Sequence, residues 1–293
     1  MSDIPIGVIG GSGLYRMEGL SDTVEHRIDT PFGAPSDLLV SGRLGEARVV
    51  FLARHGRSHS LTPTEIPFRA NLWALKSLGV RWLLSVSAVG SLHENLAPLD
   101  VVLPDQFIDL TRQRAKTFFG AGVVAHVGLA QPVCPALADV VVQAHAEVGF
   151  GRGRLHRGGS YVCIEGPQFS TLAESQLYRS WGARVIGMTN MPEAALAREA
   201  EIAYATLALV TDYDCWHPTH GTVTVDMAIA NLMENAGNAQ RLVGAVVQRL
   251  HAQRPVSEAH TALSSALITP PQAIDAAARE RLAPLLARVL GPA

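Results

Sequence analysis

The sequence predicts a single-domain α/β protein, and three observations support this prediction. Short apolar runs that are typical of strands alternate with helical patterns along most of the 293-residue chain. The connections between successive strand candidates are long, which favours a mainly parallel sheet. Hydrophobic residues make up 48% of the chain and charged residues 17%, which is enough apolar material for one large core.

Local patterns place the expected elements along the chain. Apolar runs predict strands at residues 4–9, 48–53, 82–86, 101–103, 161–164, 185–188 and 203–210. Helical spacing predicts helices at residues 68–78, 136–148, 193–200, 225–250 and 279–290. A further helix is expected from Thr171 to about Trp181, because T-x-x-E forms a capping box there and Gly182 follows. Residues 1–293 are expected to form one domain, with a helical tail over about residues 253–293.

Composition argues against several classes of protein. The 24 Lys and Arg residues nearly balance the 26 Asp and Glu residues, so the chain lacks the basic excess of a nucleic-acid binder. Its 3 cysteines are scattered, which argues against a disulfide framework and a cysteine zinc site. No apolar run approaches the roughly 18 residues of a membrane span, and the N-terminus lacks a signal-peptide pattern. We therefore expect a soluble cytoplasmic protein that binds neither nucleic acid, nor a membrane, nor a metal.

The first segment with chemical potential is G-G-S-G-L, directly after a strand candidate. The backbone N–H groups around Gly11 and the hydroxyl of Ser12 suit an anion such as phosphate. The segment does not complete the G-x-G-x-x-G dinucleotide fingerprint, because position 16 is Arg16. An ordinary tight turn is an equally good interpretation of this segment alone.

Two further segments also follow strand candidates and offer donors to an anion. In R-H-G-R-S-H, Arg54 provides a planar fork of N–H groups and His55 a second donor. In S-V-S-A-V-G-S, interpreted as a strand that enters a turn of small residues, Ser87 provides a hydroxyl. Ligands of open α/β sheets sit at the carboxyl ends of strands, where these residues are expected. A solvated basic loop and a small-residue packing turn are the respective alternatives.

Polar and aromatic residues also surround the later helix starts. In E-G-P-Q-F-S, Phe169 is suited to stack on a flat heterocycle and Ser170 to bond its edge. The alternative is that Phe169 belongs to the core and Ser170 helps to cap the helix. In G-M-T-N-M-P-E, Thr189 is another candidate phosphate donor, and Glu193 is interpreted as complementing the dipole of its helix.

The motif T-D-Y-D-C-W closes a very apolar strand candidate. Asp212 and Asp214 are two residues apart, so both carboxyl groups can face one pocket. Two carboxylates that are close together and partly desolvated tend to hold a proton, and a protonated acid can protonate a leaving group. Solvated acids on a surface loop are the alternative.

Taken together in order and spacing, these six motifs resemble the trimeric class of purine nucleoside phosphorylases over about residues 6–250. Within that class the chain most resembles the members that act on 5'-methylthioadenosine. The resemblance implies one nucleoside phosphorylase domain with a twisted mixed sheet, partly closed into a barrel and surrounded by helices. It also implies a homotrimer, with a dimer of trimers as the alternative assembly.

The resemblance assigns roles to individual positions. It implies a phosphate site formed by Gly11, Ser12, Arg54, His55, Ser87 and Thr189. It places Met188 against the ribose, the purine against Phe169 and Ser170, and Asp212 and Asp214 opposite purine N7 and the 6-amino group. Two more positions concern the 5' end of the substrate, namely Val225 beside the methylthio group and His126, lent by a neighbouring subunit.

The implied reaction is the phosphorolysis of 5'-methylthioadenosine to adenine and 5-methylthioribose 1-phosphate, a pentosyl transfer in purine and methionine salvage. Inorganic phosphate is the co-substrate, and the chemistry calls for no cofactor. Asp212 is the expected acid at N7. A 6-oxopurine nucleoside phosphorylase or methylthioinosine phosphorylase is the alternative within the family, although acidic partners favour a 6-amino group. A nucleotide-binding regulator without catalysis is the alternative from another class.

Overall fold

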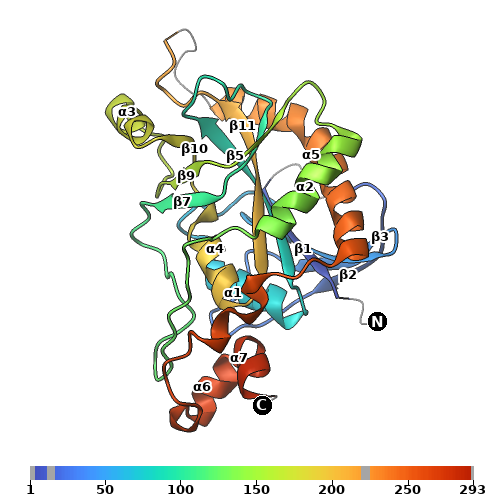
Figure 1. The fold of residues 1–293 in the computed structure, drawn as a ribbon, viewed down its shortest axis with the longest axis vertical. Coiled ribbons are helices and arrows are strands. Elements are labelled where there is room, and N and C mark those ends of the chain that lie inside the picture. Colours follow the sequence, from blue (N-terminus) through green and yellow to red (C-terminus); the bar gives the residue numbers. More distant parts are fainter. Residues whose placement is uncertain (1–3, 12–16, 219–224, 292–293) are drawn as a thin grey trace.

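A long central strand, β5 (Trp82–Ser91), organises the sheet of this protein (Figure 1). The computed structural model describes residues 4–11, 17–218 and 225–291. One arm of the sheet has the spatial order β2 (Leu20–His26), β3 (Leu39–Leu44), β4 (Ala47–Ala53), β1 (Ile6–Gly10), β5, β11 (Ala203–Asp212), β6 (Val101–Leu103) and β8 (Leu155–Arg157). The other arm leaves the end of β5 through β10 (Ala183–Gly187), β9 (Ser160–Cys163) and β7 (Gln106–Asp109).

The sheet is mixed, and its centre is parallel. Strands β4, β1, β5 and β11 run in the same direction, whereas β10 pairs antiparallel with the end of β5 and β6 pairs antiparallel with β11. No pairing among the described residues joins the far ends of the two arms. The expected α/β fold with a central mixed sheet among helices is confirmed, and closure of the sheet is at most partial.

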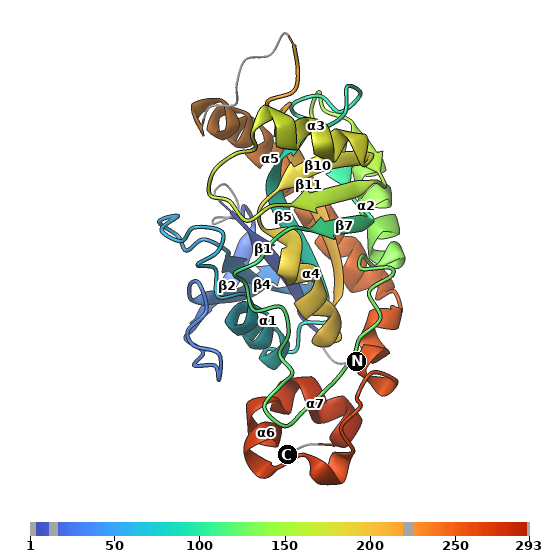
Figure 2. The ribbon, with the colours of Figure 1, turned by 90° about the vertical axis from the view of Figure 1, so that its left-hand side faces the viewer.

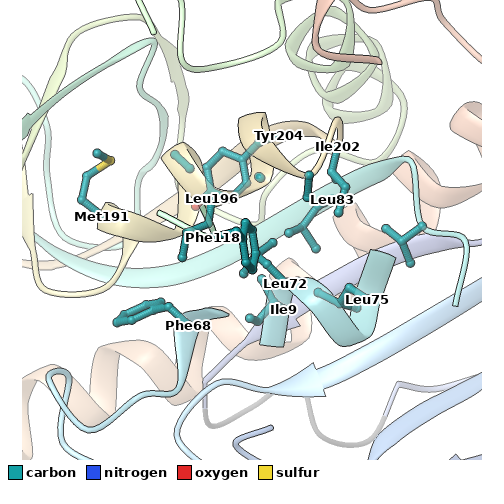
Figure 3. Packing of buried hydrophobic residues seen from close by; sticks show 14 of the residues in the cluster. Ile9, Phe68, Leu72, Leu75, Leu83, Phe118, Met191, Leu196, Ile202 and Tyr204 are labelled. Carbon is teal, nitrogen blue, oxygen red and sulfur yellow. The ribbon is translucent and has the colours of Figure 1, made fainter. Parts of the chain in front are cut away.

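Helices cover both faces of the sheet (Figures 1 and 2). On one face lie α2 (Pro135–Val148) and α5 (Val225–Gln253), and on the other lie α1 (Phe68–Ser77), α4 (Asn190–Glu199) and α7 (Ala283–Leu290). Alternate residues of each central strand supply the two cores: Leu83 packs with the α1 and α4 side, and Leu84 with the α2 and α5 side. Figure 3 shows the first of these cores, in which Tyr204 lies among apolar side chains.

The expected helix start at Thr171 is confirmed. Thr171 is the N-cap of α3 (Leu172–Ser180): its hydroxyl accepts a bond from the Glu174 backbone, and the Glu174 carboxylate accepts one from the Thr171 backbone. This capping box fixes where the preceding loop ends, and that loop carries Phe169 and Ser170. The alternative that Ser170 caps this helix is therefore wrong.

Several expectations need correction. The segment 85–91 is not a turn, because β5 continues through it to Ser91. The strands β2, β3, β7 and β8 were not predicted. The helix expected at residues 279–290 is divided at Leu282 into α6 (Ala276–Arg281) and α7, because Pro284 begins a new helix. The tail also contains two 3₁₀ helices, Glu258–Ser264 and Pro271–Ala273.

No helix within residues 4–11, 17–218 and 225–291 is both long enough and apolar enough to span a bilayer.

Candidate active site

A cavity of about 450 Å³ lies at the carboxyl ends of the central parallel strands. Its wall is formed by the residues that follow β1 and β4, the second half of β5, and the ends of β10 and β11. Side chains of α5 complete the wall on one side, including Leu232 and Ala236. The volume is in the range that holds a small organic ligand, and the position is the usual one for ligands of open α/β sheets.

Most of the residues predicted from the sequence meet in this cavity. Its lining includes Gly11, Arg54, His55, Ser87, Phe169, Ser170, Met188, Thr189, Asp212 and Asp214. Ser12 lies outside the described residues, as does the side chain of Val225. His126 is exposed and does not line the cavity; its backbone N–H donates to the carbonyl of Ala266 in the tail.

One wall of the cavity was not predicted from the sequence. The segment 59–63 runs along it, and the ring of His59 stacks on that of His55 with centroids 4.4 Å apart. His59 has a positive φ of 52°, which an L residue rarely adopts and which no sequence pattern revealed. The proximity of this segment to Arg54 in the chain was the only available signal.

Arg54 is fixed in the wall by four hydrogen bonds. Its Nε and Nη2 donate to the two carboxylate oxygens of Glu193 at 2.7 and 2.9 Å. Its Nη1 donates to the carbonyl of Val86 at 3.0 Å, and Nη2 also donates to Ser85 Oγ at 2.6 Å. Arg54 is only 1% exposed. Burial lowers the pKa of the guanidinium, but the Glu193 carboxylate outweighs burial and raises the pKa above its ordinary value.

This geometry corrects the interpretation of Glu193. Its carboxylate does not simply complement the dipole of α4, because it is fully buried and forms a bidentate ion pair with Arg54. The alternative of a solvated basic loop around Arg54 is wrong for the same reason. Arg54 brings positive charge to the cavity wall, and Glu193 neutralises that charge from behind.

His55 lies next to this pair as a neutral imidazole. Burial, together with the nearby Arg54 charge, lowers its pKa to about 4, although a bond to Leu61 opposes the shift. Nδ1 lies 2.9 Å from the Leu61 carbonyl, which only accepts, so Nδ1 carries the proton. Neutral His55 therefore offers an acceptor at Nε2, and not the second donor expected from the sequence. A phosphate that keeps a proton can donate its P–OH group to such an atom.

At the other end of the cavity lie the two acids, 7% and 6% exposed. The Asp212 carboxylate accepts a bond from the Thr211 hydroxyl at 2.6 Å and from the Asp214 backbone at 2.8 Å. Burial raises the pKa of Asp212 above its ordinary range despite these bonds. Burial also raises the pKa of Asp214, and the neighbouring Asp212 charge adds to that rise. The alternative of solvated surface acids is wrong.

Gly90 of β5 permits this arrangement of acids. A Cβ atom at position 90 would lie 2.9 Å from Asp212 Oδ1 and 3.4 Å from Asp214 Cβ. Any side chain there would displace the carboxylate, so the small residue serves close packing within the strand. The small residues of this segment therefore belong to the site, although the strand does not turn there.

Phe169 and Ser170 form a further part of the cavity wall. Phe169 is 47% exposed at the cavity, so it does not belong to the core. The Ser170 hydroxyl is buried beside it without a hydrogen-bond partner among the described residues, which leaves it available to a ligand. Arg114 holds the adjoining loops together, because its guanidinium donates to the carbonyls of Met188 and Met191 at 2.6 and 2.7 Å.

These features define a class of protein: an α/β enzyme whose cavity carries a buried arginine suited to an anion at one end and two buried acids at the other. Among the described residues, no group of three or more His, Cys, Asp or Glu side chains is arranged to hold a metal ion. Transfer between a flat ligand and an anion is the chemistry that such a cavity permits.

Comparison with known proteins identifies the family. Residues 5–248 match the sequence profile of the Phosphorylase superfamily, and the chain belongs to that family. The S-methyl-5'-thioadenosine phosphorylase of Thermosynechococcus vestitus is 63% identical over 285 residues, which cover 97% of this chain and 99% of that protein. The protein of the same name from Gloeobacter violaceus is 60% identical over 284 residues, or 97% of this chain and 95% of that protein.

Solved structures agree with this assignment. A methylthioadenosine phosphorylase from an antarctic soil metagenomic library has a TM-score of 0.93 and 56% identity, covering 97% of this chain and all of that one. The S12T mutant of the adenosine/methylthioadenosine phosphorylase from Schistosoma mansoni, in complex with methylthioadenosine, has a TM-score of 0.81 and 35% identity. That match covers 85% of this chain and 92% of the Schistosoma chain.

Proposed function

We propose that this enzyme catalyses the phosphorolysis of 5'-methylthioadenosine to adenine and 5-methylthioribose 1-phosphate. The observation that carries the proposal is the cavity itself, which unites an anion end around Arg54 with two buried acids, Asp212 and Asp214. The names and the high identities of the relatives support the substrate. Inorganic phosphate is the second substrate, and this chemistry calls for no metal or organic cofactor.

In the proposed mechanism, the bond between C1' and purine N9 breaks as C1' develops oxocarbenium character. The leaving purine gathers negative charge, and the Asp212 carboxyl group donates a proton or hydrogen bond at N7. Its raised pKa suits this role, because it keeps the proton to a higher pH than an ordinary aspartate. Phosphate, held beside Arg54 and Thr189, stabilises the cation and then attacks C1' through an oxygen atom.

The proposed specificity also follows from the acids. An ionised Asp214 accepts a hydrogen bond from a 6-amino group, whereas it repels the carbonyl oxygen of a 6-oxopurine. Phe169 offers its ring to the purine, Ser170 its hydroxyl to the purine edge, and Met188 a thioether side chain to the ribose. A preference for adenine over hypoxanthine is therefore the expected outcome.

The proposed assembly is a homotrimer, with a dimer of trimers as the larger alternative. Helix α5, which lines the cavity through Leu232, also exposes Ile229 (48%) and Met233 (72%). Val124 and Ile268 are exposed near His126 and provide a second group of apolar side chains on the surface. Covering both surfaces in a head-to-tail ring would bring His126 of one subunit to the cavity of the next. The proposed location is the cytoplasm, where the enzyme would serve purine and methionine salvage.

A substrate panel tests this function. Methylthioadenosine, adenosine, methylthioinosine and inosine are each incubated with the protein, with and without phosphate, and release of the free base is measured. We expect phosphate-dependent release that is fastest with methylthioadenosine. Release that is independent of phosphate, or a preference for the inosine compounds, would reject the proposal. Binding without any base release would instead indicate a regulator.

Mixed trimers test whether His126 contributes to the active site of a neighbouring subunit. Co-expression of Asp212→Ala with an inactive His126 variant creates sites that combine an intact Asp212 from one chain with an intact His126 from its neighbour. Partial recovery of activity is expected. No recovery in verified mixed trimers would place the whole site within one chain.

A further inference from the structure

Behind the anion end of the cavity lies a chain of buried hydrogen bonds with Glu193 at its centre. The Glu193 carboxylate accepts two bonds from Arg54, and its Oε1 also accepts the Tyr204 hydroxyl at 2.9 Å. Glu193 has no exposed surface and does not line the cavity. It is therefore too deep to touch a ligand, yet it holds a residue that does line the cavity wall.

The chain continues from Tyr204 to a second residue of the wall. The Tyr204 oxygen accepts a bond from Asn190 Nδ2 at 2.5 Å, and Asn190 Oδ1 accepts one from the Ser87 hydroxyl at 2.9 Å. A carboxylate only accepts, so the Tyr204 hydroxyl donates to Glu193, and this fixes the direction of each later bond. Glu193 thus controls Arg54 directly and Ser87 through two intermediate side chains.

Regular elements carry the three interior members of this chain. Asn190 and Glu193 lie in α4 on either side of its non-helical residue Met191, and Tyr204 belongs to β11. The Tyr204 ring packs in the hydrophobic cluster shown in Figure 3, so the core fixes the position of its hydroxyl. A buried ion pair contributes little net stability, because desolvation offsets the attraction of the two charges. Its value here is geometric, since it leaves Arg54 a single orientation.

We propose that Glu193 is a positioning residue for phosphate: it orients the Arg54 guanidinium and, through Tyr204 and Asn190, the Ser87 hydroxyl. The Ser87 proton is directed at Asn190, so the Ser87 oxygen is left to accept a bond from a P–OH group. The inference rests on the proposed function, because it assigns the anion end of the cavity to phosphate. It predicts that changes at Glu193 act on phosphate binding and leave nucleoside binding unchanged.

The main test is Glu193→Asp, which keeps the charge but shortens the side chain by one methylene group. The KM for phosphate should rise at least about 10-fold, the order expected when charged hydrogen bonds are lost. The KM for methylthioadenosine should change less than about twofold, and much of kcat should return at saturating phosphate. An unchanged KM for phosphate, or an equal rise in both KM values, would overturn the proposal.

The matched control is Glu201→Asp. Glu201 is 1% exposed and forms a bidentate pair with the more exposed Arg288, at 2.6 and 2.5 Å, away from the cavity. Both variants should have a lowered Tm, but only Glu193→Asp should weaken phosphate binding. If Glu201→Asp raises the KM for phosphate equally, general destabilisation explains the effect and the proposal fails.

Tyr204→Phe tests the second arm and leaves the ion pair intact, so it remains informative if Glu193→Asp does not fold. It should raise the KM for phosphate several-fold, and it should add nothing further in a Ser87→Ala background, because both changes act on one group. Additive effects would show that Tyr204 does not act through Ser87. If the wild-type protein releases base without phosphate, the proposed function fails. If the wild-type protein depends on phosphate but the variants keep its KM for phosphate, the proposed function stands and only the role of Glu193 fails.

Discussion

The two ends of the cavity differ in whether their buried ionisable groups have a partner of opposite charge. At the anion end, Arg54 is matched inside the protein by Glu193, and His55 is neutral. At the other end, Asp212 and Asp214 are also buried, but no cation among the described residues pairs with them. A paired charge is rigid and suits positioning, whereas an unpaired buried acid holds its proton more tightly and suits proton donation.

The largest expected effect comes from removing the acid. Asp212→Asn should lower kcat on methylthioadenosine by roughly 10²-fold or more, since it cannot act as a general acid. The amide can donate to a 6-oxo group, so activity on inosine compounds should decline less. Steady-state kinetics with both substrate types measure this difference. Undiminished adenine release would show that Asp212 is not the acid.

The same variant should not lose stability. Because the folded-state pKa of Asp212 is raised, its contribution to stability is present below the unfolded pKa and is lost as the pH rises through the folded pKa. Above that folded-state pKa the ionised carboxylate opposes folding, so in that range Asp212→Asn should have a Tm equal to or a few degrees above that of the wild type. A large fall in Tm would show that the carboxylate has a structural role.

Arg54→Ala should have the next largest effect, at the opposite end. It removes charge-assisted bonds of about 1.5–3 kcal/mol, so the KM for phosphate should rise by about one to two orders of magnitude. It also leaves Glu193 buried without its cation, and the Tm should fall. Arg288→Ala is the control, because it likewise leaves the buried Glu201 without its arginine but lies away from the cavity. Unchanged phosphate dependence in Arg54→Ala would exclude Arg54 from the site.

Replacing His55 should have a smaller effect, on stability, that appears only at acidic pH. Its folded-state pKa of about 4 lies below the ordinary 6.5, so its contribution to stability is present above about pH 6.5 and is lost as the pH falls toward 4. At about pH 5 this loss amounts to about 1–2 kcal/mol. The Tm of His55→Gln should therefore decline less between about pH 7.5 and about pH 5 than that of the wild type. Equal declines would contradict a buried neutral imidazole.

The sequence predicted the central elements well, because both cores leave a clear pattern. The alternation of Leu83 and Leu84 between two cores, for example, produces the continuous apolar run of β5. Strand β2 leaves no such pattern, because five of its residues are exposed at the edge of the sheet. Small residues such as Gly90 were taken for a turn, because close packing against Asp212 is a tertiary constraint.

The site likewise has one part that sequence motifs predicted and one part that only the folded chain shows. The predicted residues lie in recognisable motifs at or after strands, and ten of them line the one cavity. The partners behind them could not be predicted, because the contact between Arg54 and Glu193 joins positions 139 residues apart. The acceptor role of His55 depends likewise on its bond to the Leu61 carbonyl. Sequence motifs predicted what faces the ligand, whereas the protonation and orientation of those groups depend on the folded chain.

The smallest expected effect concerns salt and tests the comparison of the two ends directly. Because Glu193 neutralises Arg54 at 2.7 Å and His55 is uncharged near neutral pH, the anion end has no net positive charge to be screened. The KM for phosphate should then change less than about twofold between about 50 and about 500 mM NaCl. Glu193→Gln removes the neutralising charge, so in that variant the KM for phosphate should increase with salt. A steep dependence in the wild type would show that phosphate is attracted by an excess positive charge, and that the pairing of Arg54 with Glu193 does not govern this end of the cavity.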